Sequence, residues 1–414
     1  MRRCVVIGAG AREHALAWGL AKSADVVVTP GNAGIAAHGI TCVNSPAQEL
    51  DADLFVIGPE QPLVEGLADE LRRQGKVVVG PGFDGAQLEG SKAFMKEFLE
   101  SAGVPTARFG VFRHEVEATA FLATMEPPYV VKTDGLAAGK GVLVTPDLGE
   151  ALEDVRAKLS GAAFGNAGTT VIIEEGLDGE ECSLLVLCDG TVAVPLVPAQ
   201  DFKRVGDDNQ GANTGGMGAY APMLAMTDDQ VDVVMATIVA PTLSELKKRG
   251  IDFRGVLYAG VMLTSKGPKL LEYNVRFGDP ETEVLVPLYG ENLFDMLLRT
   301  GEGRLDTTPI VTRDFAVTVV LAAHGYPQSP RAGDVIGGLG SDGQLAHPIE
   351  GVTVFHAGTA LDGQGRFVTA GGRVLTLTGV GSSIAQARER AYAAAALVTF
   401  EGRVMRHDIA LAAV

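Results

Sequence analysis

The stretch from Leu271 to Glu281, LEYNVRFGDPE, holds the densest set of side chains that could carry out chemistry. Glu272 and Asn274 stand two apart in an expected strand, so both oxygens face one side, which suits a hard cation such as Mg²⁺. Arg276 shares that face and can bind a carboxylate, while Gly278 and the Asp-Pro-Glu after it are typical of a helix start. A polar edge strand is the simpler alternative, but the density of these groups favours a site for a metal and an anion.

A second stretch, VVKTDGLAAGKGV from Val130 to Val142, places Lys132 on an expected strand and Lys140 at the end of a glycine-rich loop. Glycines let backbone N–H groups approach phosphate oxygens, and lysines supply positive charge. The loop is not a Walker A sequence, because Gly follows the Gly-Lys pair and the preceding spacing is wrong. It indicates a hairpin lid over a triphosphate, with two solvated lysines in a flexible loop as the alternative.

The segment IIEEGLDGEECSLLV, residues 172–186, joins two β-branched strands through an acidic linker. Such a linker could bind the edge of adenine through backbone groups near Glu174 and Leu177. Glu181, seven residues after Glu174, could then hold the ribose hydroxyls. A charged turn is the alternative, and the segment alone does not exclude it.

Before the metal-type strand lie DFKR, from Asp201 to Arg204, and the glycine-rich NTGGMGAY at residues 213–220. The two cations of DFKR, Lys203 and Arg204, could stabilise charge on a transferring phosphoryl group. Without its neighbours, the segment is equally well described as a solvated basic turn.

Three glycine-containing loops follow expected strands near the N-terminus: Gly8 to His14, Pro30 to Gly34, and Gly58 to Glu60. They would meet at the carboxyl edge of a parallel sheet, where α/β folds bind ligands. The first lacks the third glycine of the dinucleotide fingerprint, and no acidic residue closes the second strand, so a small phosphorylated ligand is favoured. The helix after Gly10 would offer free N–H groups to a phosphate beside Arg12. Ordinary turn glycines are the alternative.

A parallel βα unit must hold these loops, and hydrophobic patterning predicts one over residues 1–102. The expected strands are 4–7, 26–28, 54–57 and 77–79, and the expected helices are 13–20, 63–71 and 92–100. Ser91 would cap the last helix, and Gly75 and Gly103 would end the last two.

Beyond residue 102 the pattern changes, since hairpin-like pairs around 129–144 and 171–194 indicate an α+β unit. After Thr312, short glycine-rich strands precede one alanine-rich helix, which indicates a smaller β-rich unit. We therefore expect a multidomain α/β and α+β chain. Its domains would be 1–102, 103–312 with a lid at about 120–190, and 313–414, with late strands at 335–338, 352–358 and 371–379 and the late helix at 383–397.

Composition narrows the class of protein. The 414 residues are 46% hydrophobic and 21% charged, as in ordinary globular proteins, and are too many for one compact core. A net charge of -17 opposes non-specific binding to nucleic acid or anionic lipid, and the short apolar run after Met1 is no signal or membrane segment. The four scattered cysteines match no zinc or redox motif and are expected as buried thiols.

Taken in order, the Ser-Lys pair at 91, KTDGLAAGKGV, EEGLDGEE, NTGGMGAY and EYNVRFGDPE resemble the ATP-grasp enzymes, and among them the phosphoribosylamine-glycine ligases of purine biosynthesis. The resemblance spans essentially the whole chain, since GAGAREHALAW near the start and GYP, FHAGT and GGRVL towards the end also match. It implies an N-terminal Rossmann-like domain for phosphoribosylamine, an ATP-grasp core and a small β-rich C-terminal domain.

The reaction implied by this resemblance phosphorylates glycine with ATP and joins the glycyl phosphate to 5-phosphoribosylamine, releasing ADP and phosphate. It needs position and charge neutralisation rather than a protein nucleophile. By resemblance, the residues are Lys92, Lys132 and Lys140 for the ATP phosphates, Glu174, Leu177 and Glu181 for the nucleoside, Glu272 and Asn274 for Mg²⁺ or Mn²⁺, Lys203 and Arg204 for the transferring charge, Arg276, Gly278, Asp279 and Glu281 for glycine, and Gly8, Gly10, Arg12, Gly31, Asn32, Gly34 and Glu60 for phosphoribosylamine.

Two features depart from the resemblance. Phe202 stands in AQDFKR where the family usually has His, which removes a hydrogen-bonding group beside Lys203 and Arg204. The segment YAGVM offers no acidic metal ligand on the strand before Glu272. The alternatives are a carboxylase acting on an aminoimidazole nucleotide or biotin with bicarbonate, and a non-catalytic nucleotide sensor. We expect a cytoplasmic, monofunctional monomer that binds these small molecules and neither nucleic acid nor membrane.

Overall fold

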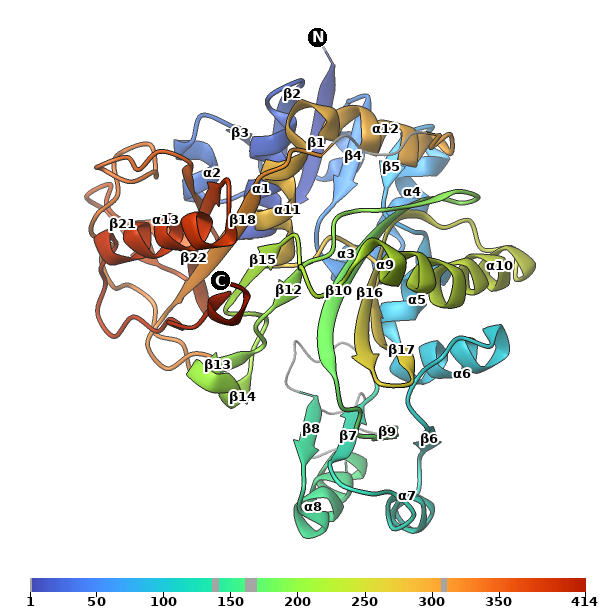
Figure 1. Ribbon diagram of the computed structural model, residues 1–414. Helices are drawn as coiled ribbons and strands as arrows, with labels where there is room; N and C mark the ends of the chain where they lie inside the picture. Colours follow the sequence, from blue (N-terminus) through green and yellow to red (C-terminus); the bar gives the residue numbers. More distant parts are fainter. Residues whose placement is uncertain (1, 136–140, 161–169, 307–310) are drawn as a thin grey trace.

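The computed structural model describes residues 2–135, 141–160, 170–306 and 311–414 (Figure 1). The predicted fold class is confirmed: a parallel α/β unit, an α+β middle and an antiparallel β-rich C-terminal unit. The proposed domain boundaries at residues 102 and 312 stay a prediction. None of the helices in the described ranges is long and apolar enough to cross a membrane.

The N-terminal unit is a parallel sheet of order β3-β2-β1-β4-β5. Its central strand β1 reads CVVI and is buried, as expected where helices cover both faces of a parallel sheet. All four predicted strands are present, and the short β3 escaped prediction. The strands are β1 (Arg3–Gly8), β2 (Asp25–Pro30), β3 (Thr41–Cys42), β4 (Leu54–Ile57) and β5 (Val78–Val79).

One predicted helix of this unit is wrong. The expected helix from 63 to 71 is interrupted at Gly66, whose φ of 86° is left-handed, so that two short helices replace it. Only glycine adopts this conformation without a steric cost, and the apolar spacing could not reveal the break. The helices are α1 (Ala11–Leu20), α2 (Ala33–Ala37), η1 (Ala47–Glu49), α3 (Glu60–Val64), α4 (Leu67–Arg73) and α5 (Phe83–Gly90).

The helix predicted at 92–100 is confirmed as α6 (Lys92–Ala102). The Ser91 side chain accepts a hydrogen bond from the Phe94 N–H, and Gly103 ends the helix with a φ of 68°. These are the usual N-terminal and C-terminal signals.

A small antiparallel sheet, β6-β9-β7-β8, follows with its own apolar core, and Figure 1 shows it projecting away from the parallel sheet. The hairpin predicted around 129–144 is confirmed as β7 paired with β8. We call this sheet with its two helices the lid. It comprises β6 (Phe109–Phe112), α7 (Glu115–Leu122), β7 (Tyr129–Thr133), β8 (Val142–Thr145), α8 (Leu148–Leu159) and β9 (Val171–Glu175).

The pair predicted around 171–194 is not one hairpin. β9 ends in the lid, whereas β10 (Glu180–Asp189) lies in a second sheet of order β11-β10-β16-β17, where it pairs with β11. The linker between them crosses from one sheet to the other. Local patterning cannot reveal this, because the partners of each strand come from distant sequence. The other strands are β11 (Ala193–Pro195), β16 (Arg254–Thr264) and β17 (Gly267–Asn274).

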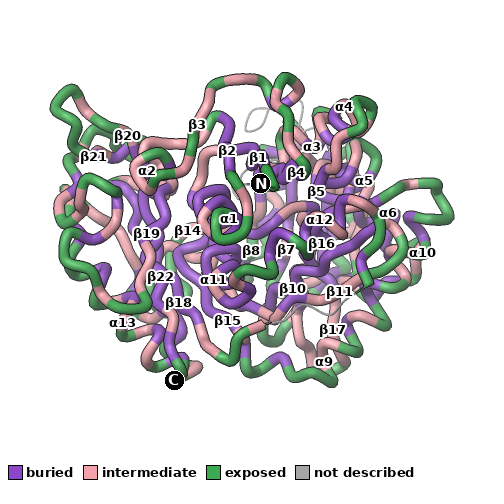
Figure 2. Tube along the Cα trace, turned by 90° about the horizontal axis from the view of Figure 1, so that it is seen from above, coloured by how far each residue is buried: buried purple, intermediate pink, exposed green. Residues whose placement is uncertain are grey.

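Helix α12 packs on β10 and β16 of this central sheet, whereas α11 lies at the centre of the molecule against α1 (Figure 2). Nearly every residue of α11 is buried, including the polar Glu281, Thr282 and Glu283 of its first turn. The helices are α9 (Asp228–Val234), η4 (Met235–Val239), α10 (Ala240–Lys248), α11 (Glu281–Tyr289), η5 (Gly290–Asn292) and α12 (Leu293–Glu302).

The C-terminal sheet has the order β12-β15-β18-β22-β19, so two of its strands come from the middle of the chain. The late helix is confirmed as α13, with the Ser383 hydroxyl accepting from the Gln386 N–H, and it packs on β22 and β18. The predicted strand at 335–338 appears only as isolated bridges. The elements are β12 (Gln200–Asp201), β13 (Arg204–Gly206), η3 (Asp207–Asn209), β14 (Gln210–Asn213), β15 (Gly218–Ala221), β18 (Phe315–Ala322), β19 (Val352–His356), β20 (Thr359–Leu361), β21 (Phe367–Thr369), β22 (Arg373–Gly381), α13 (Ile384–Leu397) and η6 (Leu411–Ala413).

Candidate active site

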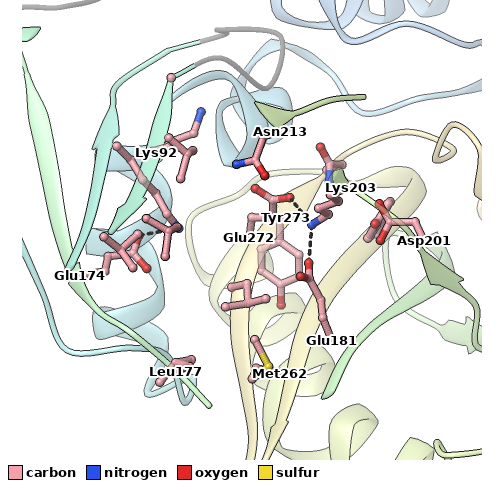
Figure 3. A pocket seen from close by; sticks show the side chains of 18 of the residues that line it. Lys92, Glu174, Leu177, Glu181, Asp201, Lys203, Asn213, Met262, Glu272 and Tyr273 are labelled. Atoms are coloured by element: carbon pink, nitrogen blue, oxygen red, sulfur yellow. Dashed lines mark hydrogen bonds and ion pairs between the residues drawn. The ribbon is translucent and has the colours of Figure 1, made fainter. Parts of the chain in front are cut away.

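A cavity of about 710 Å³, here called the central pocket, lies between the lid, the central sheet and the loop after β12 (Figure 3). It gathers residues from every nucleotide-type and metal-type motif of the sequence. The predicted residues that line it are Glu60, Lys92, Lys132, Glu174, Leu177, Glu181, Lys203, Arg204, Glu272, Asn274, Arg276, Asp279 and Glu281.

Other predicted residues lie elsewhere. The lining does not include Gly8, Gly10, Arg12, Gly31, Asn32, Gly34 or Gly278. Lys140 falls outside the described residues. The assignment of roles to all these residues therefore remains a prediction, and the geometry below says what each side chain contacts.

One wall of the pocket holds a buried charge triad that includes Lys96, a residue that the motifs missed. The Glu174 carboxylate lies 2.9 Å from Lys96 Nζ through one oxygen and 2.8 Å from Lys132 Nζ through the other. Lys96 is fully buried and also donates to Thr106 Oγ1 at 2.7 Å. Burial raises the pKa of Glu174, but Lys132 and Lys96 outweigh that effect and hold it below its usual value, so the carboxylate stays ionised.

Glu174 has a structural role beside the predicted one, which concerned the backbone near it and stays a prediction. Its side chain fixes two ammonium groups, one of which, Lys132, reaches the pocket, and it is itself buried. Lys96 sits one turn after Lys92 on α6, and only the pairing of the lid with α6 shows that they belong to one site. A lysine inside an apolar helix face was the available signal in the sequence.

The pocket is polar at one end and apolar at the other. Figure 3 shows Leu177 and Met262 together at one end and Lys92 and Asn213 at the opposite end. Leu177 lies on the linker between β9 and β10, and its contact with a purine base stays a prediction. Met262, on β16, was missed, because an alternating strand gives no sign of which face borders a cavity.

The metal-type pair meets the pocket at the end of β17. Glu272 and Asn274 both line it, as their two-residue spacing predicts. The charge of Lys203 is the main cause that lowers the pKa of Glu272 to about 2, so this carboxylate is ionised at neutral pH. One ionised carboxylate and one amide oxygen form a donor set that fits Mg²⁺ or Mn²⁺ when phosphate and water complete the shell. Among the described residues, no group of three or more His, Cys, Asp or Glu offers a metal cage.

Lys203 links the two carboxylates that the sequence assigned to ribose and metal. Its ammonium forms ion pairs with Glu181 and, at 3.4 Å, with Glu272 (Figure 3). Burial lowers the pKa of Lys203, but these carboxylates outweigh that effect and raise it, so the side chain carries its charge. Asp201, on the neighbouring β12, was not singled out for a role. Burial raises its pKa well above the usual value.

Arg276 is more fully engaged than the sequence suggested. Its guanidinium lies 3.2 Å from Glu60 and 2.9 Å from Glu89, and it donates to Asn274 Oδ1 at 3.2 Å. Glu89, on α5, is a missed residue that also accepts from the Val275 N–H at 2.8 Å. A substrate carboxylate at Arg276 would therefore have to share the guanidinium with two resident carboxylates.

The start of α11 carries further acidic side chains. Glu281 is buried and accepts hydrogen bonds from Tyr258 at 2.6 Å and Ser183 at 3.0 Å. Asp279 was expected to act as a helix cap, but α11 begins after Pro280 with no side-chain cap. The Asp279 carboxylate instead pairs with Arg373 of β22 at 3.0 Å, which ties α11 to the C-terminal sheet.

The expectation of free N–H groups after Gly10 is wrong for that residue. The Gly10 N–H donates to the Glu13 carboxylate at 2.6 Å, and Arg12 pairs with the same carboxylate at 2.5 Å. A side chain at Gly8 or Gly58 would collide with Glu13. The helix start thus binds an acidic side chain from its own first turn, an arrangement that its local dipole favours.

Asn32 connects two sheets. Its amide donates to the carbonyls of Ala9 and His356, both at 2.8 Å, and its oxygen caps α2 through the Ile35 N–H. Gly34 is in close contact with the ring of His356. This loop therefore holds the N-terminal sheet to β19.

Comparison with known proteins agrees with this architecture. Family models described as the N domain, the ATP-grasp (A) domain and the C domain of phosphoribosylglycinamide synthetase match residues 2–89, 90–282 and 316–412. The chain belongs to this synthetase family. A phosphoribosylamine-glycine ligase of Brucella melitensis is 46% identical, covering 100% of this chain and 98% of that protein. One of Streptomyces coelicolor is 46% identical over 99% of this chain and 98% of its own length.

Solved structures support the family assignment and the fold. The crystal structure of phosphoribosylamine-glycine ligase from Thermotoga maritima aligns with a TM-score of 0.86 at 37% identity, covering 98% of this chain and all of that one. A biotin carboxylase domain from Hydrogenobacter thermophilus aligns with a TM-score of 0.72 at 17% identity, covering 98% and 91% of the two chains. At 17% identity, the second likeness shows only that the two chains share a fold.

Proposed function

We propose that this synthetase-family chain joins glycine to 5-phospho-D-ribosylamine with ATP, through a glycyl phosphate, and releases glycinamide ribonucleotide, ADP and phosphate in purine biosynthesis. The activity rests on full-length similarity to phosphoribosylamine-glycine ligases. The observation that carries the site assignment is the convergence of five separate sequence motifs on one pocket.

ATP would lie along the long axis of the pocket. The apolar end around Leu177 and Met262 suits the purine base, while Glu181, a few residues further along the chain, suits the ribose hydroxyls. Lys92 and Lys132 line the same pocket as cations for the phosphates, and the predicted contact of Lys140 falls outside the described residues.

The cation would be held by Glu272 and Asn274, and when bound it would neutralise phosphate charge. We propose that this cation is Mg²⁺ or Mn²⁺. Lys203 and Arg204 would stabilise the charge of the phosphoryl group in transfer, because both line the pocket and Lys203 pairs with Glu272.

Glycine would be oriented by Arg276 with Gly278, Asp279 and Glu281, next to the cation ligands. Phosphorylation turns a poor leaving oxygen of its carboxylate into a good one, so that the amine of phosphoribosylamine can displace phosphate. Phosphoribosylamine would approach from the N-terminal loops, with Glu60 as the residue of that group that lines the pocket. We also propose that the chain is a monomer and that it acts in the cytoplasm.

An assay for ADP with each substrate omitted in turn tests this function. ADP release should require ATP, glycine and phosphoribosylamine together. If bicarbonate supports ADP release without glycine, the chain is a carboxylase. If no combination supports turnover although ADP binds, it is a nucleotide sensor.

The cation site is tested by Glu272→Ala, with Glu117→Ala, an exposed change on the lid helix α7, as the control. We expect Glu272→Ala to keep its fold but to lose turnover by about a hundredfold or more, which corresponds to ~2.7 kcal/mol. Binding of Mn²⁺ in the ADP complex, followed by electron paramagnetic resonance, should weaken in parallel. A Glu272→Ala enzyme with normal turnover would remove the metal assignment.

A further inference from the structure

Arg406, near the C-terminus, is one of the most buried large side chains among the described residues, with 1% exposure. Its guanidinium forms two parallel hydrogen bonds with Asp408, at 2.7 Å and 2.6 Å. The remaining nitrogen reaches across the structure and donates to the Arg204 carbonyl at 3.2 Å and to Asn209 Oδ1 at 2.9 Å. A C-terminal arginine therefore binds the segment that carries the predicted phosphoryl-transfer cations.

The same guanidinium lies over the ring of Phe202. The Arg406 Cζ lies 4.9 Å from the centre of the Phe202 ring, which in turn lies against Tyr220 at 6.4 Å. A desolvated guanidinium over an aromatic ring is an attractive contact. It gives a physical reason for Phe202 at the position where the resemblance led us to expect His.

The neighbours of Arg406 extend this contact. The His407 N–H donates to Asp207 at 2.7 Å, and the Asp408 carboxylate accepts from the Asp208 N–H at 2.9 Å. Asp208 and Asn209 both have a φ of 54°, a left-handed conformation that non-glycine residues seldom adopt. Contacts from outside the turn hold it in this shape. We call residues 406–408 the C-terminal clamp.

The clamped segment leads directly into the pocket. The backbone next to Phe202 is held on its other side as well, because Thr214 donates to the Lys203 carbonyl at 2.8 Å and the Phe202 N–H donates to Gly218 at 3.0 Å. The clamp is one anchor of this backbone, and the hydrogen bonds to Thr214 and Gly218 are the other. Between these two anchors the Lys203 side chain extends to Glu181 and Glu272. The direction of the Lys203 side chain thus depends on both anchors.

We propose that the C-terminal clamp is a positioning element for the reaction: Arg406, by binding Phe202, Arg204 and Asn209, holds Lys203 in line with the transferring phosphoryl group. The proposal rests on the function proposed above. Arg406 does not line the pocket, so it acts through the loop and not on a substrate.

Arg406→Lys is the first test, because lysine keeps the charge but loses the paired hydrogen bonds and the flat face. Phe202→Leu is the second, since it removes the ring and leaves the hydrogen bonds. The matched control is Arg403→Gln, an arginine of the same segment that donates to the carbonyls of Ala395 and Val398 and not to the loop.

We expect Arg406→Lys and Phe202→Leu to lower kcat by about tenfold to a hundredfold, as a ~1 Å misplacement near the chemistry does. Both should leave the dissociation constant of MgADP within about threefold, a difference below 0.7 kcal/mol. The control should keep its kcat. A purely structural role predicts a lower melting temperature with an unchanged kcat of the folded enzyme, and that result would overturn the proposal.

Coupling to Lys203 gives the sharper outcome. In a Lys203→Met background, Arg406→Lys should cause little further loss of kcat, because the group that it positions is gone. If the two losses multiply instead, the clamp acts independently of Lys203 and the proposal is wrong. If Arg406→Lys does not fold, the same double-mutant comparison with Lys203→Met is made with Phe202→Leu. Failure of the proposed function is distinct, since the unmodified enzyme would then release no glycine-dependent ADP.

Discussion

Replacing Lys96 with Met tests the buried charge triad behind the pocket. Methionine is close in length and leaves no cavity of consequence, so the change removes mainly a charge. At present Glu174 has an ammonium on each oxygen, Lys96 at 2.9 Å and Lys132 at 2.8 Å. After the change, Lys132 alone must neutralise a fully buried carboxylate.

The expected loss of folding stability depends on the ion pair between Lys132 and Glu174, which the variant keeps. Breaking a buried ion pair outright costs about 3–5 kcal/mol, and losing one charged hydrogen bond costs about 1.5–3 kcal/mol. Because Lys132 still compensates Glu174, we expect the lower range, ~2–3 kcal/mol. For a chain of 414 residues this corresponds to a fall in melting temperature of roughly 2–4 °C. Lys132 should also be drawn more tightly to Glu174, which weakens MgADP binding by about tenfold, or ~1.4 kcal/mol.

The dependence on pH provides a second measurement. Burial, partly offset by the charge of Glu174, lowers the pKa of Lys96 from 10.5 to about 8. Below pH 8 the ammonium is present and shares Glu174, whereas above pH 8 it is lost and the site should behave like the variant. MgADP affinity of the unmodified protein should therefore decline above about pH 8, and that of Lys96→Met should stay level.

Calorimetric titration of MgADP between pH 6.5 and pH 9.5 measures both effects, with the folded state checked by circular dichroism. Lys266→Met, an exposed lysine in the turn between β16 and β17, is the control and should behave like the unmodified protein. If Lys96→Met folds and binds MgADP with unchanged affinity and the same pH profile, then Lys96 does not govern Lys132 and the reasoning is refuted.

Two further predictions concern stability. Glu283 is fully buried, neither oxygen has a hydrogen-bond partner in the described chain, and burial with the charge of Asp279 raises its pKa well above 4.5. Above pH 4.5 the unfolded chain releases a proton that the folded state keeps. Stability therefore falls by about 1.4 kcal/mol for each pH unit between 4.5 and the raised pKa of the folded state. Glu283→Gln should therefore raise the melting temperature, more at pH 8 than at pH 5, and an equal effect at both values would contradict this. Asn32→Ala should lower stability by ~2–3 kcal/mol in urea titrations, since it loses a helix cap and leaves two carbonyls without a donor; a raised KM for phosphoribosylamine at unchanged stability would instead support the predicted substrate contact.

Many of the residues that line the pocket could be predicted from the sequence, because their spacing is a local property of the chain. The two-residue spacing of Glu272 and Asn274 placed both on one face of a strand, and the structure turns both into the pocket. Ser91 was predicted to cap α6 and does so, because a side-chain cap depends only on the next few residues.

Residues that act through distant partners escaped prediction. Glu89 and Lys96 lie on helices whose apolar pattern reports only that one face is buried, and their partners Arg276 and Glu174 come from other elements. Glu13 was predicted only as the first residue of a helix, yet its carboxylate lies against Gly8 and Gly58.

The sequence by itself predicted the kind of chemistry, since residue types and short spacings indicate a pair of cation ligands, lysines for phosphates and an arginine for a carboxylate. These roles remain predictions. Tertiary structure alone decided which charges neutralise one another. It separated β9 from β10 into two sheets and brought Arg406 against Phe202 across the chain. The physical reason is that strand pairing and burial depend on contacts between distant segments, whereas periodicity and capping are properties of a few consecutive residues.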